Sequence, residues 1–96
     1  MAAMSSRIER IRTLLNDAFS PFVQDVQDDS ARHSGHAGAR PEGETHFNVL
    51  LVSAAFRGQG RLQRHRAVQD ALAPEFAGGL HALSLTLRTP EEHFAD

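Results

Sequence analysis

The 96-residue chain contains no cysteine, no tryptophan, no tyrosine and no lysine. The absence of cysteine excludes a disulfide scaffold and makes a reducing cytoplasm the expected compartment. Without tryptophan or tyrosine, the core has to be built from aliphatic side chains and six phenylalanines. No apolar run approaches the ~20 residues that span a bilayer, and the opening "MAAMSSRIER" lacks the apolar stretch of a signal peptide. We therefore expect a cytoplasmic protein that has no membrane partner.

The length of the chain predicts a single domain, which we place over residues 1–96 with a flexible N-terminus at 1–5. The net charge is −2, so no overall electrostatic field attracts the protein to nucleic acid. All ten basic residues are arginines. A local cluster of these arginines can still bind phosphate on an acidic protein.

Apolar residues at helical spacing predict a first helix over residues 6–19. Ser6 and Glu9 have the spacing of a capping box at its start, and Ser20-Pro21 ends it because the residue before a proline avoids the α region. The stripe expected to be buried consists of Ile8, Ile11, Leu14, Leu15, Ala18 and Phe19.

Three segments are predicted to be strands. Residues 22–30 form the weakest candidate, whereas residues 45–53 alternate well between apolar and polar positions. These two strands are expected to pair antiparallel across a long, glycine-containing connection. Residues 80–88 also alternate, with His81 on the same face as three leucines at 83, 85 and 87.

Between and after these strands the sequence predicts a turn at residues 57–61 and a helix over residues 62–76. This helix is expected to break near Pro74, to end at Gly78-Gly79, and to bury Leu62, Val68, Ala71 and Leu72. Thr89, Pro90 and Glu92 predict a final short helix with a second capping box. The α-β-β-α-β-α order indicates an α+β fold, in which helices cover one face of a small three-stranded sheet.

The sequence offers no arrangement that is typical of a catalytic centre. Cysteine, the strong nucleophile, is absent, and none of the serines at 30, 34, 53 and 84 lies in a G-x-S-x-G turn. The acidic pairs at 28–29 and 91–92 fit a strand end and a helix cap, and no glycine-rich phosphate loop is present. We therefore expect that the protein is not an enzyme.

Three of the six histidines are candidate metal ligands. His33 and His36 lie among glycines and alanines, which allow a cofactor to approach the backbone, and His81 is expected at the rim of an apolar strand face. A lone histidine is more often a surface residue or a hydrogen-bonded residue at the edge of the core than a metal ligand, and this is the alternative for each of them. If the loop folds back over the rim, two imidazoles converge there, and a partner has to supply the other ligands.

Four arginines, Arg57, Arg61, Arg64 and Arg66, surround His65 in the turn and the helix that follows it. Together with the helix N-terminus they could contact phosphate oxygens, so these five residues are a candidate nucleic-acid site. The alternative is a solvated helix face. Residues 64 and 66 point about 200° apart on a helix, so that one can pack while the other reaches into solvent.

The chain also carries a series of motifs in a specific order: "DDSARH", "GHAG", "ETHFNVLLVS", F-x-G at residues 56–58, "RHRAVQDAL" and "GLHALSL". In this order and spacing they resemble the BolA family, from the first helix to "TPEE". The resemblance implies a fold related to type II KH domains, with "RHR" in a helix-turn-helix-like segment. The phosphate-clamping G-x-x-G of KH domains is not found, because "GQG" at residues 58–60 is not that motif.

Members of this family pair with monothiol glutaredoxins and share a 2Fe-2S cluster with them, in iron–sulfur cluster trafficking and iron homeostasis. The resemblance implies that His81 and either His33 or His36 are the ligands of such a cluster. Alone, the chain is expected to be a monomer without a metal, and with its partner a heterodimer. Some members are described as DNA-binding transcription regulators of stress response and cell shape, which would use the segment from Arg57 to Arg66.

Overall fold

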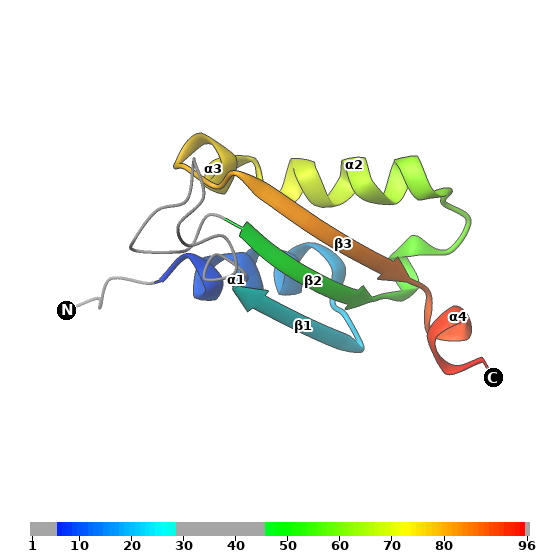
Figure 1. The fold of residues 1–96 in the computed structure, drawn as a ribbon. Coiled ribbons are helices and arrows are strands. Elements are labelled where there is room, and N and C mark those ends of the chain that lie inside the picture. Colours follow the sequence, from blue (N-terminus) through cyan, green and yellow to red (C-terminus); the bar gives the residue numbers. More distant parts are fainter. Residues whose placement is uncertain (1–5, 29–45, 96) are drawn as a thin grey trace.

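The computed structural model describes residues 6–28 and 46–95 (Figure 1). The predicted flexible N-terminus at residues 1–5 and the loop that carries His33 and His36 lie outside the described residues. The elements follow in the order α1 (Arg7–Phe19), β1 (Val23–Asp28), β2 (His46–Val52), the 3-10 helix η2 (Ala54–Phe56), α2 (Arg61–Ala71), α3 (Ala73–Ala77), β3 (Ala82–Arg88) and α4 (Pro90–Phe94). The α+β class and the order of strands and helices are confirmed, with η2 as an addition.

The three strands form one mixed sheet in the order β1-β2-β3. β1 pairs antiparallel with β2, as predicted, with Val26 opposite Val49. β2 pairs parallel with β3, so that His46 lies opposite Ala82 and Val49 opposite Leu85. The α2–α3 segment supplies the long crossover that a parallel pair of strands requires.

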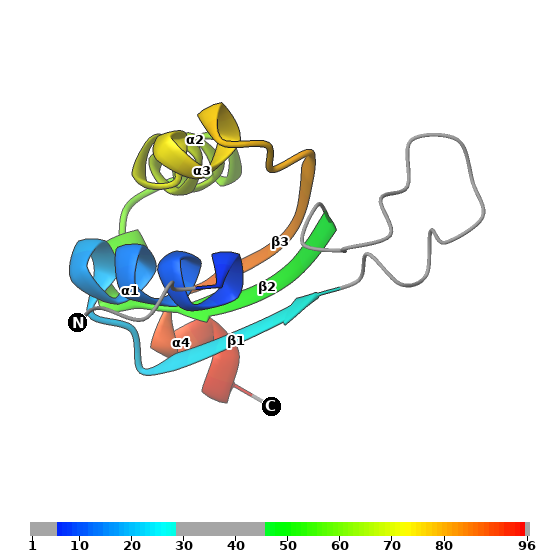
Figure 2. The same ribbon diagram turned by 90° about the vertical axis from the view of Figure 1, so that its left-hand side faces the viewer.

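The helices α1, α2 and α3 cover one face of this sheet (Figure 2). The predicted alternation in β2 is confirmed, because Phe47, Val49 and Leu51 are buried whereas the residues between them are half-buried. These three side chains pack with buried residues of α1 and α2 in one apolar core. From the helices this core receives Ile11, Leu15, Phe19, Val68 and Leu72.

Two predicted core residues are exposed. Leu62 has 62% of its surface exposed, because it lies six positions before Val68 and therefore about 240° away around α2. Ala18 is also exposed, since the buried stripe of α1 runs through residues spaced by four, namely Ile11, Leu15 and Phe19. Helical spacing thus predicted the buried faces but included too many residues in them.

The predicted helix over residues 62–76 is divided into α2 and α3 at Leu72. Pro74 lies in the first turn of α3, where its missing N–H removes no helical hydrogen bond. α3 ends at Ala77 and is capped by Gly78. Gly79 follows with φ of +118°, a backbone conformation that residues other than glycine rarely adopt. The predicted break near Pro74 and the end at Gly78-Gly79 are both confirmed.

A nearly buried carboxylate fastens this α3 turn to α1. The side chain of Glu75 is 8% exposed and accepts hydrogen bonds from Arg7 Nε at 3.1 Å and from Arg10 Nε at 2.9 Å. Arg7 Nη2 also donates to the carbonyl oxygen of Gly78 at 2.7 Å. The hydrogen bonds from Arg10, followed by those from Arg7, hold the pKa of Glu75 below its ordinary value of 4.5. The turn that leads into β3 is therefore fixed to the first helix by charge.

Replacing Glu75 with glutamine should lower the free energy of unfolding by about 2 kcal/mol at pH 7, because two guanidinium groups lose their counter-charge. Urea unfolding followed by circular dichroism measures this difference. Because the folded-state pKa is lowered, the stabilisation is present above pH 4.5 and is lost as the pH falls below it. The difference between the two proteins should therefore shrink in acid. The control Asp17→Asn removes an exposed carboxylate of α1 and should change stability by less than about 0.5 kcal/mol.

Candidate functional site

Two histidines, at the starts of β2 and β3, meet at one end of the sheet. His46 is the first residue of β2, and His81 immediately precedes β3. Because these strands are parallel and in register, their amino ends lie together, and the two imidazole centroids are 5.8 Å apart. His46 is half-buried and His81 is exposed. We call this pair the histidine rim.

Only one of the two histidines of the rim, His81, was predicted as a site residue. The predicted strand covers residues 80–88, whereas β3 begins at Ala82, so that His81 immediately precedes the strand. Its position at the end of the sheet is as expected. His46 was not predicted as a site residue at all. The signal that could have found it is the long helical crossover between residues 45–53 and 80–88, which makes these two strands parallel and aligns their starts.

His33 and His36 lie in the segment 29–45, outside the described residues. The residues on either side of that segment, Asp28 and His46, lie at the same end of the sheet, since Asp28 is opposite Phe47. The two described residues that flank the segment, Asp28 and His46, therefore both lie beside the histidine rim.

The donors at the histidine rim are suited to part of a metal site. Neutral imidazole nitrogen is a common metal ligand, and it binds one iron of the cluster in Rieske centres. Within residues 6–28 and 46–95, no group of three or more histidine, cysteine, aspartate or glutamate side chains is arranged to hold a metal ion. The rim therefore fits a metal group whose remaining ligands come from outside the described residues.

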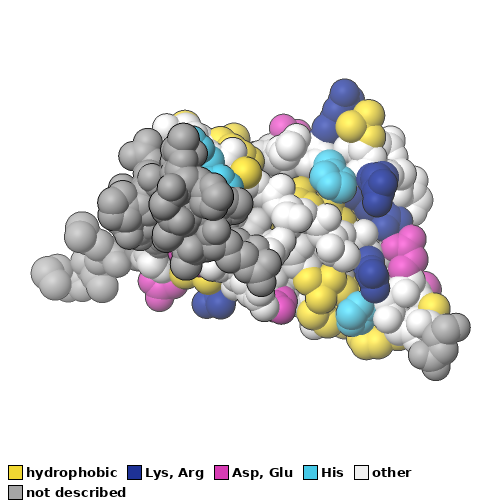
Figure 3. Space-filling view, viewed as in Figure 1, with side chains coloured by type: hydrophobic (Ala, Val, Ile, Leu, Met, Phe, Trp, Pro, Cys, Tyr) yellow, Lys and Arg dark blue, Asp and Glu magenta, His cyan; other side chains and the backbone are white. Residues whose placement is uncertain are grey.

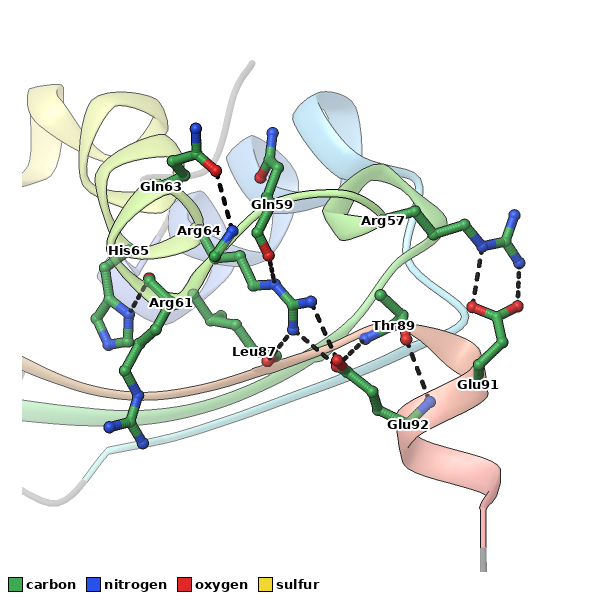
Figure 4. Close-up of polar contacts among 11 residues, drawn as sticks. Arg57, Gln59, Arg61, Gln63, Arg64, His65, Leu87, Thr89, Glu91 and Glu92 are labelled. Atoms are coloured by element: carbon green, nitrogen blue, oxygen red, sulfur yellow. Dashed lines mark hydrogen bonds and ion pairs between the residues drawn. The ribbon is translucent and has the colours of Figure 1, made fainter.

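The predicted nucleic-acid residues lie at the opposite end of β3, where α2 begins (Figure 4). Two of the four arginines form ion pairs with α4: Arg57 with Glu91, and Arg64 with Glu92. Arg61 and Arg66 are exposed, and neither guanidinium has an ion-pair partner in the described part of the chain. The prediction that residues 64 and 66 differ, one packed and one in solvent, is confirmed.

Arg64 connects three parts of the fold. Its side chain is only 13% exposed, and it donates to the carbonyl oxygens of Gln59 at 2.9 Å and Leu87 at 3.1 Å. It also bonds both carboxylate oxygens of Glu92, at 2.7 and 3.1 Å. These hydrogen bonds, together with one from the backbone N–H of Thr89, lower the pKa of Glu92 from 4.5 to about 2. Arg64 therefore has a structural role, because its guanidinium group is already bonded to two carbonyl groups and a carboxylate of the protein.

A groove lies beside these residues, between the start of α2 and the last four residues of β3. Its volume is about 480 Å³, and its lining includes Arg61, His65 and Arg88 as well as the Arg64–Glu92 pair. The ring of His65 is held close to its own helix, with Nδ1 3.0 Å from the carbonyl oxygen of Arg61. Figure 3 shows arginine side chains gathered at this end of the molecule, with acidic side chains beside them. We call this feature the α2–β3 groove.

Comparisons with known proteins identify relatives over nearly the whole chain. A family model described as BolA-like protein matches residues 15–92. SufE-like protein 1, chloroplastic/mitochondrial, of Arabidopsis thaliana is 44% identical over 96 residues, which cover 96% of this chain and 26% of that protein. Human BolA-like protein 1 is 48% identical over 82 residues, which cover 85% of this chain and 57% of that protein. The chain thus spans less than two thirds of the length of either relative.

The solved structure of the BolA domain of SufE1 from Arabidopsis thaliana superimposes with a TM-score of 0.82. It is 44% identical, and the match covers 94% of this chain and 99% of that domain. In the described part of the chain, no helix has the length and apolar character needed to cross a membrane. The cytoplasmic location stays a prediction, since the name of the plant relative refers to chloroplasts and mitochondria.

Replacing Arg64 with glutamine should raise the pKa of Glu92 from about 2 part of the way back to 4.5, because only the hydrogen bonds with the backbone and side chain of Thr89 remain to lower it. Titration of the carboxyl carbon by NMR measures this change. The same variant should lower the midpoint of thermal unfolding by about 5 °C, since the carbonyl groups of Gln59 and Leu87 lose a charged donor. Arg66→Gln is the matched control and should change neither quantity. A Glu92 pKa that stays near 2 in the Arg64 variant would contradict the assigned cause.

Proposed function

Because this chain belongs to the BolA family, we propose that it pairs with a monothiol glutaredoxin and shares a 2Fe-2S cluster with it, in iron–sulfur cluster trafficking and iron homeostasis. The observation that carries the proposal is the histidine rim, where His46 and His81 present two imidazoles 5.8 Å apart at one edge of the sheet. In this role the protein is an adaptor, and its function is to hold and orient ligands for its partner.

The ligand chemistry of the chain supports a shared cluster. The sequence has no cysteine, so any sulfur ligand has to come from the glutaredoxin and a thiol bound to it. Imidazole is neutral where thiolate is negative, and a cluster with imidazole ligands accepts an electron more readily than one with thiolates alone. When bound, the cluster supplies one-electron redox chemistry and transferable iron and sulfide.

The fold supports His81 as the ligand with the better-fixed position. It follows the Gly78-Gly79 turn, which Arg7 and Glu75 fasten to α1, and it precedes a strand that is bonded to β2. An exposed imidazole on such a support can face a partner without a change of fold. The second ligand is then one of three residues: His33, His36 or His46.

The test uses a monothiol glutaredoxin reconstituted with iron, sulfide and glutathione, to which this protein is added. Exchange of a thiolate for an imidazole at one iron should change the visible absorption and circular dichroism spectra. His81→Ala should abolish this change. Among the alanine variants at His33, His36 and His46, one should behave like the His81 variant and the other two like the wild type. His65→Ala, which changes a histidine at the other end of β3, is the control and should leave the spectra unchanged.

Far-ultraviolet circular dichroism of each variant separates loss of a ligand from loss of the fold. Binding of glutaredoxin without a cluster is expected to survive the histidine replacements, because it depends on the surrounding surface. If a variant that lacks all four histidines still gives the wild-type spectra, the histidines are not ligands and the proposed function is wrong.

The DNA-binding role stays a prediction with a smaller cationic surface than the sequence implied. Only Arg61 and Arg66 of the four arginines are available for phosphate, because Arg57 and Arg64 are paired with α4. Replacing Arg61 and Arg66 together with alanine should therefore weaken any DNA binding for all sequences and reduce its salt dependence. Filter binding at several salt concentrations measures this effect. Unchanged affinity in the double variant would exclude this helix as the DNA-binding surface.

A further inference from the structure

The outer edge of β3 has backbone groups that no other strand among the described residues uses. β3 is the last strand of the sheet, and the carbonyl of Leu87 points away from β2, because it accepts a hydrogen bond from Arg64 of α2. The carbonyl of the next residue, Arg88, points toward β2, because it accepts from Ser53 N–H. Since these directions alternate along a strand, the N–H and C=O groups of Leu83 and Leu85 also point outward.

This edge lacks the usual protection against pairing with another strand. Natural edge strands are commonly blocked by charged side chains, proline or a bulge. Between Ala82 and Leu87, β3 contains only leucine, alanine, serine and threonine, and its parallel pairing with β2 is continuous. Among the described residues, the only side-chain hydrogen bond to these outward groups is the one from Arg64 to the carbonyl oxygen of Leu87, near the C-terminal end of β3. The edge is therefore open to a further strand.

The α2–β3 groove runs along this open edge and carries positive charge. Arg61 on one side and Arg88 on the other line it, and neither has an ion-pair partner within the described residues. Glu92 is the one acidic side chain among the described lining residues, and it is already paired with Arg64. The half-buried side chains of Leu85 and Leu87 add an apolar floor. A ligand that fits this groove has backbone hydrogen-bonding groups, apolar side chains and negative charge.

We propose that the α2–β3 groove binds an acidic, extended peptide segment of a partner protein, which adds to the outer edge of β3 as a fourth strand. Leu85, which lines the groove, and Leu83, two residues before it on the same strand edge, exchange backbone hydrogen bonds with the segment, at a spacing of about 7 Å that matches alternate residues of a strand. Arg61 and Arg88 bind its carboxylates. A nucleic acid would use the two arginines but not the row of alternating donors and acceptors, which is why a peptide fits better.

The probe for this site is a fluorescein-labelled peptide of seven residues in which glutamate and valine alternate. Fluorescence anisotropy should show saturable binding to the wild-type protein. Arg61→Glu and Arg88→Glu should each weaken binding at least tenfold, because they place negative charge in the groove. Arg66→Glu makes the same change of charge on α2 at a residue that does not line the groove, and it should have less than a threefold effect.

A second peptide, N-methylated on its three central backbone amides, separates strand addition from simple charge attraction. It keeps all the carboxylates but loses the donors, so it should bind at least tenfold more weakly than the first peptide. Equal binding of the two peptides would overturn the proposal.

Amide hydrogen exchange measured by NMR locates the contact. The amides of Leu83 and Leu85 should exchange quickly in the protein alone and at least tenfold more slowly with the peptide. Those of Ser84 and Thr86, which face β2, should be slow in both conditions. Three results would overturn the proposal: no change at Leu83 and Leu85, protection of these amides at high protein concentration without peptide, or binding of an oligothymidine in the groove when the peptide does not bind.

Discussion

β2 is hydrogen-bonded along both of its edges, and the positions of the other elements depend on these two pairings. Its antiparallel pairing with β1 sets Val26 against Val49, and its parallel pairing with β3 sets Val49 against Leu85. The same register places the apolar side chains of all three strands on the face that α1 and α2 cover. A shift of β3 by one residue would turn its leucines to the open face and would separate His81 from His46. The core and the histidine rim therefore rest on one register.

The two ends of β3 have different chemistry. At its start, the histidine rim brings two imidazole side chains together, and Glu75 joins the turn before it to α1 through ion pairs. At its end, the α2–β3 groove carries the guanidinium groups of Arg61 and Arg88, which form no ion pair with any described residue, beside the outer edge of the strand. The proposed cluster ligands and the arginines of the groove are therefore different residues, near opposite ends of one strand. The family membership of the chain supports a role for the rim, whereas the groove follows from backbone geometry and charge.

Ion pairs with α4 decide which arginines can meet a ligand. Glu91 and Glu92 follow the Thr89 cap of α4, so both carboxylates lie in the first helical turn, where the helix dipole favours negative charge. From there they bind Arg57 and Arg64 and leave Arg61 and Arg66 in solvent. The short helix α4 thus neutralises two of the four arginines that the segment from Arg57 to Arg66 contains.

Local sequence patterns were sufficient for the order of the main helices and strands, for most of the helix caps and for the family, but not for the 3-10 helix η2. The capping boxes at Ser6 and Thr89 and the glycines after α3 fix the ends of helices through contacts within a few residues, so they could be read from spacing alone. The alternation in β2 predicted its buried face for the same reason. The order of motifs predicted the BolA family, which the family model confirms over residues 15–92.

What only the tertiary structure decided involves residues that are far apart in the chain. His46 lies beside His81 because a parallel register joins residues 35 positions apart in the chain, and no local pattern contains that register. Likewise, Arg64 and Arg66 have the same side chain two positions apart, but only Arg64 lies within reach of Glu92, after β3 has brought α4 back to the start of α2. A sequence states which side chains can bind a metal or a phosphate. Which of them are already bound to one another depends on distances that exist only in the folded chain.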